Sequence, residues 1–267
     1  MITLPASGPK PLYYSTFVGY FKEILRYLSI PFQLKGVAEH CYFVTKFDDK
    51  EVVFNFSDFY EIPKVNEYKH YFKFHYSKEE HSKYENVYPF APVSFYDWGK
   101  YKALKAKIKY TGNSNIILNM QRSYGDAVER RTSVQKILRE RYGGTVKTNY
   151  TLPQVDYWKK INNCLVHIFV PGVRNDMIDR GHVQYMAFGC CTIAPPIADV
   201  LPYNGELVSG THYIQCSPDY SDLIDKVEWC KNNRERCVEI GNNAKRLFEQ
   251  SCLPNRLWKW VLEKIND

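Results

Sequence analysis

A short polar loop at residues 173–182 holds the chain's densest group of side chains that could bind an anion. These candidates are Arg174, Asn175, Asp179, Arg180, Gly181 and His182. Apolar residues then recur at i, i+3 and i+4 over 183–187, which predicts a short amphipathic helix that ends at Gly189. Asp179 can cap this helix, and the free N–H groups of its first turn, together with the arginines, suit phosphate oxygens. A solvated loop, or salt bridges from the arginines to Asp176 or Asp179, is the competing structural interpretation.

A second group that could hold phosphate follows the apolar segment 115–120, which is expected to be a buried strand. The next residues, 121–125, form a predicted turn before a helix over 126–141, so strand, turn and helix make a βα unit. Arg122 and Ser123 then place a guanidinium and a hydroxyl beside a helix N-terminus. The chain has neither a GxGxxG dinucleotide motif nor a GxxxxGK[ST] phosphate loop, so neither of those nucleotide-binding classes is indicated.

Two residues that could act in proton transfer follow predicted strands in the first part of the chain. Asp58 comes just after the strand predicted over 51–56, and His75 lies near the end of the strand predicted over 70–76. Polar residues at strand ends are where an open α/β sheet builds its ligand crevice. Asp58 is equally compatible with a turn or a cap, and a structural role is favoured for a histidine taken by itself.

The surrounding pattern places these groups in two domains. A helix is expected over 14–30, followed by a hairpin of strands 41–47 and 51–56, and the proline-containing segment 88–95 is expected to be a linker. From about residue 97 the chain alternates helices with apolar strands. We therefore expect an α/β protein with a first domain, 1–95, and a second domain, 96–267, whose terminal helix packs back on the first.

Composition limits the classes of function. The 267 residues carry a net charge of +7, which favours an anionic partner. The 36 lysines and arginines are dispersed, so a small phosphorylated ligand fits as well as nucleic acid. No apolar run reaches the ~20 residues of a membrane span. The eight cysteines form no CxxC pair and no cleavable signal is evident, so we expect buried free thiols in a cytoplasmic protein.

The second half of the chain, roughly 115–265, resembles the nucleotide-sugar-binding domain of GT-B glycosyltransferases. The similarity rests on the strand that leads to the Arg122 turn, the polar loop before the segment DRGHVQYMAFGCCTIAP, and the later LPYN, HYI and NNAKRLFEQ segments. This half of the chain is similar to group 1 and exostosin-like glycosyltransferases. The Asp179-Arg180 pair at the helix start more closely resembles the exostosin-like group and the small glycosyltransferases of large algal DNA viruses. The paired glutamates usual in the family are absent, and the aligned positions hold Asp179 or His182 and Gln184.

The resemblance implies two Rossmann-like domains that face a cleft, with a reduced N-terminal domain. It implies a UDP- or GDP-linked sugar donor, held through its diphosphate by Arg122, Ser123 and the 174–182 loop, and a glycan or glycoprotein hydroxyl as acceptor. A viral member would work in the host cytoplasm. No nucleic-acid partner, membrane span or cofactor is expected.

The expected chemistry does not use a metal. The chain contains no Asp-x-Asp pair of the kind that metal-dependent GT-A enzymes carry, so we expect arginines and a helix N-terminus to balance the leaving diphosphate. An inverting reaction also needs a general base, for which Asp58 is the first candidate and His75 the second. A retaining reaction needs no such base, and both outcomes stay open. A nucleic-acid-binding protein, and a nucleotide-sugar epimerase of GT-B shape that uses Asp179 and His182, are the alternatives.

Overall fold

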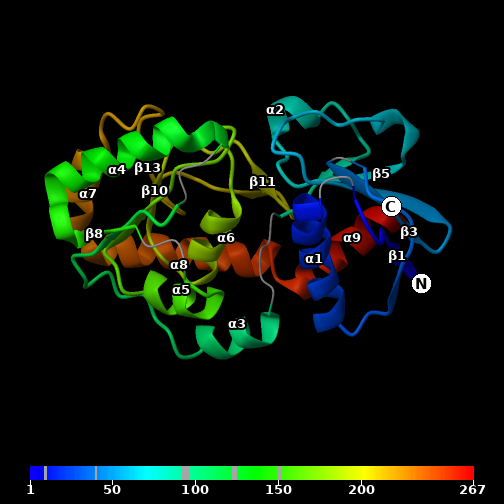
Figure 1. Ribbon diagram of the computed structural model, residues 1–267, viewed down its shortest axis with the longest axis horizontal. Helices are drawn as coiled ribbons and strands as arrows, with labels where there is room; N and C mark the ends of the chain where they lie inside the picture. The colour runs from blue at the N-terminus through cyan, green and yellow to red at the C-terminus, as the bar shows by residue number, and fades with distance from the viewer. Residues whose placement is uncertain (9–10, 40, 92–96, 122–124, 149–151) are drawn as a thin grey trace. The chain divides into compact units, whose positions relative to one another are not determined.

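The computed structural model describes residues 1–267 apart from 9–10, 40, 92–96, 122–124 and 149–151. The chain divides into two compact units, whose elements are labelled in Figure 1. Unit 1 comprises Met1–Tyr101, Ala198–Glu206 and Gln250–Asp267, and unit 2 comprises Lys102–Ile197 and Leu207–Glu249. Two segments from the later part of the chain thus complete unit 1.

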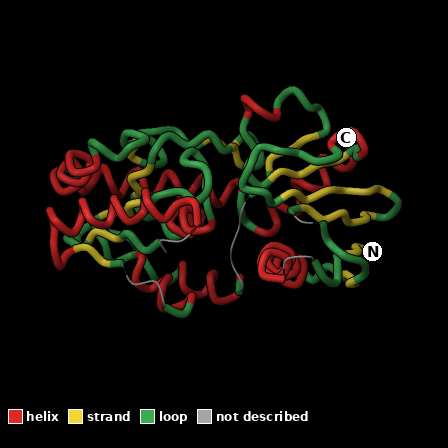
Figure 2. Tube along the Cα trace, turned by 45° about the horizontal axis from the view of Figure 1, so that its top comes forward, coloured by secondary structure: helices red, strands yellow, loops and turns green. Residues whose placement is uncertain are grey.

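Unit 1 is built on a six-stranded mixed sheet with the order β2-β1-β3-β4-β5-β6. Its strands are β1 (Ile2–Leu4), β2 (Phe32–Leu34), β3 (Tyr42–Phe47), β4 (Lys50–Asn55), β5 (His70–Lys73) and β6 (Val87–Pro89). The predicted hairpin is confirmed as the antiparallel pair of β3 and β4, a long pair of adjoining strands in Figure 2. In contrast, β4, β5 and β6 run parallel, so the residues that follow β4 and β5 emerge at one edge of the sheet.

Helix α1 (Pro11–Tyr27) packs on this sheet through aromatic rings. Phe17 stacks on Phe56, and Phe21 lies against Phe54, each with ring centroids 4.6 Å apart. All four rings are buried, which confirms the apolar helix face that the sequence predicts. Burial of each such ring contributes about 1.5–3 kcal/mol, and the aromatic pairs add to it.

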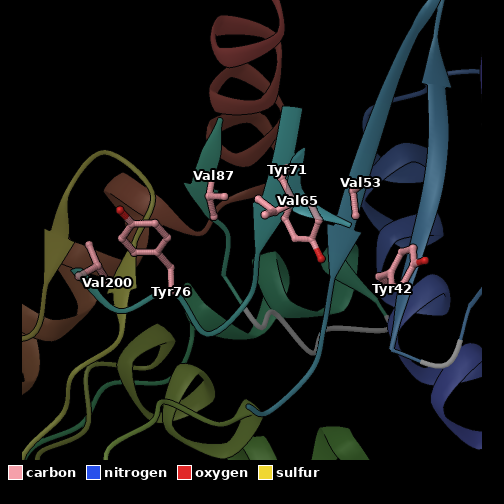
Figure 3. Packing of buried hydrophobic residues seen from close by; sticks show 7 residues of the cluster. All are labelled: Tyr42, Val53, Val65, Tyr71, Tyr76, Val87 and Val200. Carbon is pink, nitrogen blue, oxygen red and sulfur yellow. The ribbon is translucent and has the colours of Figure 1, made fainter. Parts of the chain in front are cut away.

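The remaining elements of unit 1 come from three separate parts of the chain. Helix α9 (Pro254–Asn266) lies beside α1, and its Trp260 indole donates to the Pro89 carbonyl at 2.9 Å. A small hairpin of β11 (Val200–Leu201) and β12 (Gly205–Glu206) joins them, as does the one-turn helix α2 (Lys78–His81). A second hydrophobic cluster, shown in Figure 3, joins the strands β3 to β6 with β11. Its buried members are Tyr42, Val53, Val65, Tyr71, Tyr76, Val87 and Val200.

Unit 2 contains a five-stranded parallel sheet with the order β13-β10-β9-β7-β8. Its strands are β7 (Ile117–Leu118), β8 (Val146–Lys147), β9 (Val166–Ile168), β10 (Thr192–Ala194) and β13 (Ile214–Gln215). The first of them, β7, has β8 on one side and β9 on the other. This is a doubly wound order, and its topological switch point lies between β7 and β9.

Helices connect these strands, as a parallel sheet requires. They are α4 (Val128–Tyr142), α5 (Gln154–Ile161) and α6 (Arg180–Ala187), while α3 (Trp98–Lys105) precedes the sheet in the chain and α7 (Leu223–Asn232) and α8 (Arg234–Ser251) follow its last strand. Short 3-10 turns occupy Val65–Glu67, Gly125–Ala127 and Gly143–Thr145. Within the described residues, no helix combines the length and apolar character that a membrane span needs.

Two glycines allow α6 and α8 to approach closely. Gly189 ends α6 with a φ of +72°, the left-handed conformation that favours glycine at this position. A Cβ atom placed on Gly241 of α8 would lie 2.1 Å from the Gly189 carbonyl oxygen. Position 241 therefore accepts no side chain without movement of one backbone segment.

The predicted α/β class is confirmed, and each helix and strand predicted from residue 97 onward has its counterpart. The strands β1, β2, β6, β11 and β12 were not predicted. The segment 88–95, predicted as a linker, instead begins within β6. Its proline is compatible with a strand here because β6 lies at the edge of the sheet, where one side of the strand needs no ladder hydrogen bonds.

Candidate functional site

Asp58 and His75 come together at the carboxyl ends of two adjacent parallel strands of unit 1. Asp58 follows the end of β4 and His75 follows the end of β5, and the two strands pair from Val52 with His70 onward. As a result, Oδ1 of Asp58 lies 3.4 Å from Nε2 of His75. The Asp58 side chain is 26% exposed and the His75 ring is buried, so a substrate can reach Asp58.

Asp199 is the third member of this group. Its Oδ2 atom lies 2.8 Å from Nδ1 of His75, and its side chain is buried. The imidazole is therefore held between two carboxylates, one buried and one partly exposed. Sequence reasoning missed Asp199 because 124 residues separate it from His75 and nothing in its local pattern marks it.

Backbone pairing explains how Asp199 reaches His75. Ser77 and Asp199 form an isolated antiparallel bridge, and the Val200 N–H donates to the Tyr76 carbonyl at 2.8 Å. The side chains of Tyr76 and Val200 lie close together in the cluster of Figure 3. This pairing of the two segments, which places Asp199 opposite Ser77, brings the Asp199 side chain within hydrogen-bond distance of His75.

The two carboxylates decide the charge of the imidazole. Burial by itself would lower the pKa of His75. The Asp199 carboxylate, through its charge and its hydrogen bond, and then Asp58, outweigh this effect and raise the pKa of His75 above its ordinary value. The protonated ring can donate from both nitrogens, one to each carboxylate.

The segment that carries Asp58 is also anchored. The Ser57 N–H donates to Oδ1 of Asn55 at 2.8 Å, and the Asn55 amide donates to the Tyr71 hydroxyl at 2.8 Å. The ammonium of Lys73, which is fully buried at the end of β5, donates to the Ser57 carbonyl. These contacts fix the backbone immediately before Asp58.

In unit 2, the polar loop at 173–182 follows β9 and therefore begins at the topological switch point. This is the edge at which doubly wound sheets bind ligands. The other loop at that point follows β7 and includes Arg122 and Ser123, which lie outside the described residues. The loops are tied together, because Oε1 of Gln121 accepts from the Val170 N–H at 2.6 Å.

Asp179 caps α6, as the sequence predicts. Its Oδ1 atom accepts from the N–H groups of Gly181 at 2.7 Å and of His182 at 3.2 Å. Burial raises the pKa of Asp179, whereas Arg131 and the two backbone donors act in the opposite direction. Two of the free N–H groups of the first turn are consequently occupied by the protein's own carboxylate.

Arg131 is a second residue that sequence reasoning missed. It lies 3.4 Å from Oδ2 of Asp179 and donates to the Val170 carbonyl at 3.1 Å. Its buried side chain shares one face of α4 with Val134 and Leu138. An arginine on the apolar face of a predicted helix is the signal that could have found it.

The other predicted residues of the loop have different surroundings. Arg174 forms an ion pair with Asp176 at 2.9 Å, and its side chain is only 12% exposed. The Asn175 amide donates to the Pro218 carbonyl at 2.7 Å. Arg180 is half-buried at the start of α6, and its charge acts on the neighbouring carboxylate of Asp179.

His182 lies in the core of unit 2. Its ring packs on Phe169 with a centroid distance of 4.6 Å, and it has no exposed surface. Neither ring nitrogen has a hydrogen-bond partner among the described residues, and burial lowers the pKa of His182 to about 3. The ring is therefore neutral at physiological pH. In the part of the chain that the structure describes, no group of three or more His, Cys, Asp or Glu side chains is arranged to hold a metal ion.

Two solved structures share this architecture. The Anabaena protein HepE, whose crystal structure contains UDP and glucose, matches 75% of this chain over 63% of its own length, with 10% sequence identity and a TM-score of 0.50. A glycosyltransferase from Rickettsia africae matches 96% of this chain over 81% of its own length, again with 10% identity and a TM-score of 0.50. At this level of identity the likeness establishes the fold, and it confirms the GT-B class predicted from the sequence.

Sequence relatives come from viruses of invertebrates. Uncharacterized protein 179R of Invertebrate iridescent virus 6 is 27% identical over 130 residues, which are 43% of this chain and 10% of that protein. Uncharacterized protein 035R of Invertebrate iridescent virus 3 is 37% identical over 46 residues, 17% of this chain and 4% of that protein. The chain thus spans a tenth or less of the length of these relatives. No protein-family model matches the chain.

Proposed function

We propose that this chain is a glycosyltransferase that moves a sugar from a UDP- or GDP-linked donor to a hydroxyl group of a glycan or glycoprotein. The GT-B fold supports this proposal, as do the neighbours that share it: one is a glycosyltransferase and another holds UDP and glucose. The observation that carries the proposal is the contact of Asp58 with His75 at the carboxyl ends of β4 and β5. This partly exposed carboxylate has a buried polar support, as expected for a general base.

In the proposed reaction Asp58 removes the proton from the acceptor hydroxyl. The acceptor oxygen attacks the anomeric carbon, and the bond from that carbon to the diphosphate breaks with inversion of configuration. A carboxylate within hydrogen-bond reach of the hydroxyl contributes about 10²–10⁴-fold to such a step. His75 is the alternative base, but its ring is buried and Asp58 is the more accessible of the two.

The donor diphosphate is assigned to the loops at the switch point of unit 2. Arg122 and Arg180, the latter at the start of α6, are the leading candidates, and Arg174 is the next. Fixed cations and oriented N–H groups can balance the charge that develops on the leaving diphosphate, so the proposed reaction needs no metal. Arg174 is paired with Asp176, which makes Arg180 the stronger candidate of the two.

The burial of His182 favours transfer over the epimerase alternative. An epimerase of this shape would use Asp179 and His182 as acid and base groups. The Asp179 carboxylate is engaged by the N-terminus of α6, and the ring of His182 lies in the core with a low pKa. Neither group is placed for proton exchange with a sugar.

A panel of nucleotide sugars tests the proposed function. We expect the purified chain to show a thermal shift with UDP or GDP, and to release free nucleoside diphosphate from one donor when a hydroxyl acceptor is present. Salt-sensitive binding to single-stranded DNA, together with an unfolding temperature that does not change with UDP or GDP, would support the nucleic-acid alternative and contradict the proposal.

A further inference from the structure

His75 links the candidate base, Asp58, to the buried carboxylate of Asp199. Its Nδ1 atom lies 2.8 Å from the buried Asp199 carboxylate, and its Nε2 atom lies 3.4 Å from Asp58. A buried carboxylate such as Asp199 is costly unless a cation or several donors compensate its charge. The imidazolium form of His75 supplies that compensation and still has an N–H to offer on its other side.

We infer that Asp199 and His75 are a positioning pair, which holds Asp58 in one orientation and sets an upper pH limit for transfer. This inference rests on the proposed function of Asp58 as the base. With His75 protonated, Nδ1–H donates to Asp199 and Nε2–H donates to Oδ1 of Asp58. In the proposed reaction the Asp58 carboxylate, held by this contact, accepts the proton of the acceptor hydroxyl.

Loss of the Nε2 proton removes the hydrogen bond that His75 donates to Asp58. Among the described residues, the charged groups that act on His75 are Asp199, from the segment before β11, and Asp58, from the loop after β4. Both favour the protonated ring, and burial opposes it. Activity should therefore fall as the pH rises through the pKa of His75, which these carboxylates hold above its ordinary value near 6.5.

Asp199→Asn tests the inference in a nearly isosteric way. The variant keeps an oxygen near Nδ1 but loses the charge, so the ring should lose its proton at a lower pH. We expect the alkaline limb of kcat to move to lower pH, and kcat at pH 8 to fall by roughly tenfold or more because Asp58 is no longer held in place. The KM for the nucleotide sugar should stay the same.

His75→Gln supplies the matched variant, since its amide can donate to Asp58 at every pH. We expect His75→Gln to retain part of the activity, and its kcat should no longer fall at alkaline pH. An alkaline limb that is unchanged in both variants would overturn the inference. So would an Asp199→Asn enzyme with a wild-type profile.

A measurement without substrate separates this inference from the proposed function. The ring nitrogens of His75, followed by NMR in protein labelled at histidine, should remain protonated well above pH 6.5 in the wild type and titrate at lower pH in Asp199→Asn. A neutral ring at pH 6.5 in the wild type would overturn the inference, whether or not any donor supports transfer. If the ring titrates as expected but no donor is used, the proposed function fails instead.

Discussion

Nδ1 of His75 lies 2.8 Å from Oδ2 of Asp199, although 124 residues separate them in the chain. The pair joins the carboxyl end of β5 to a segment that returns to unit 1 from the second half of the sequence. It gives unit 1 a buried ion pair in direct contact with Asp58. One histidine thus contacts both the buried carboxylate of Asp199 and the partly exposed carboxylate of Asp58.

The first prediction concerns stability and pH. The pKa of His75 is raised in the folded chain, so its contribution to the free energy of unfolding is fully present below the unfolded value of about 6.5 and is lost as the pH rises through the folded value. Between pH 6 and 9 the wild type should lose stability more steeply than Asp199→Asn. Urea unfolding at several pH values measures both slopes.

Glu51→Gln is the control for this experiment. Glu51 pairs with Lys46 at 3.3 Å in the same sheet, but both side chains are at least half exposed, and such pairs contribute little. The free energy of unfolding of Glu51→Gln should decrease with pH as steeply as that of the wild type. Equal slopes for the wild type and Asp199→Asn would show that His75 is not stabilised as a cation.

Arg180→Ala should weaken binding of the nucleoside diphosphate. A hydrogen bond to a charged group contributes about 1.5–3 kcal/mol, which corresponds to roughly 10- to 100-fold in Kd. Arg236→Ala is a matched control, because this arginine of unit 2 is half exposed and pairs with Glu239 on the surface of α8. Calorimetric titration with UDP and GDP gives the values. Identical affinities for both variants would remove Arg180 from the proposed site.

Gly241→Ala should destabilise the chain by about 1–3 kcal/mol, the usual cost of overpacking. The added Cβ would lie 2.1 Å from the Gly189 carbonyl oxygen, which belongs to the backbone and cannot move aside as a flexible side chain can. Gly19→Ala in α1 is the opposite case, since its Cβ would find nothing within 4 Å, and replacing a helical glycine gains roughly 0.5–1 kcal/mol. Thermal unfolding compares the two. A neutral Gly241→Ala would mean that α6 and α8 are less tightly packed.

The sequence predicts those parts of the fold whose signals are local. Apolar periodicity predicts α1, and the Asp179 cap and Gly189 predict the limits of α6. The strands β1 and β2 escape prediction, because each is three residues long and depends on pairing with a partner strand. The strand β6 also escapes prediction, because its Pro89 argues against a strand. A proline is acceptable there because β6 lies at the edge of the sheet.

Local patterns in the sequence likewise indicate some residues of the candidate site and leave others undetected. Asp58 and His75 can be proposed because each follows an apolar strand, and parallel pairing of β4 and β5 then brings them together. Asp199 cannot be proposed from the sequence, because it reaches His75 only where residues 198–206 join unit 1, and no local pattern encodes that path of the chain. The burial of His182 is also hidden from the sequence, where its place in the first turn of a helix indicates a ligand contact.

The most direct test of the proposed glycosyltransferase compares the wild type with Asp58→Asn in one assay of nucleotide binding and sugar transfer. We predict equal affinity for the nucleoside diphosphate, and a rate of transfer that falls about 10²–10⁴-fold in the variant, because the carboxylate no longer accepts the proton. Transfer by Asp58→Asn at the wild-type rate would contradict the account.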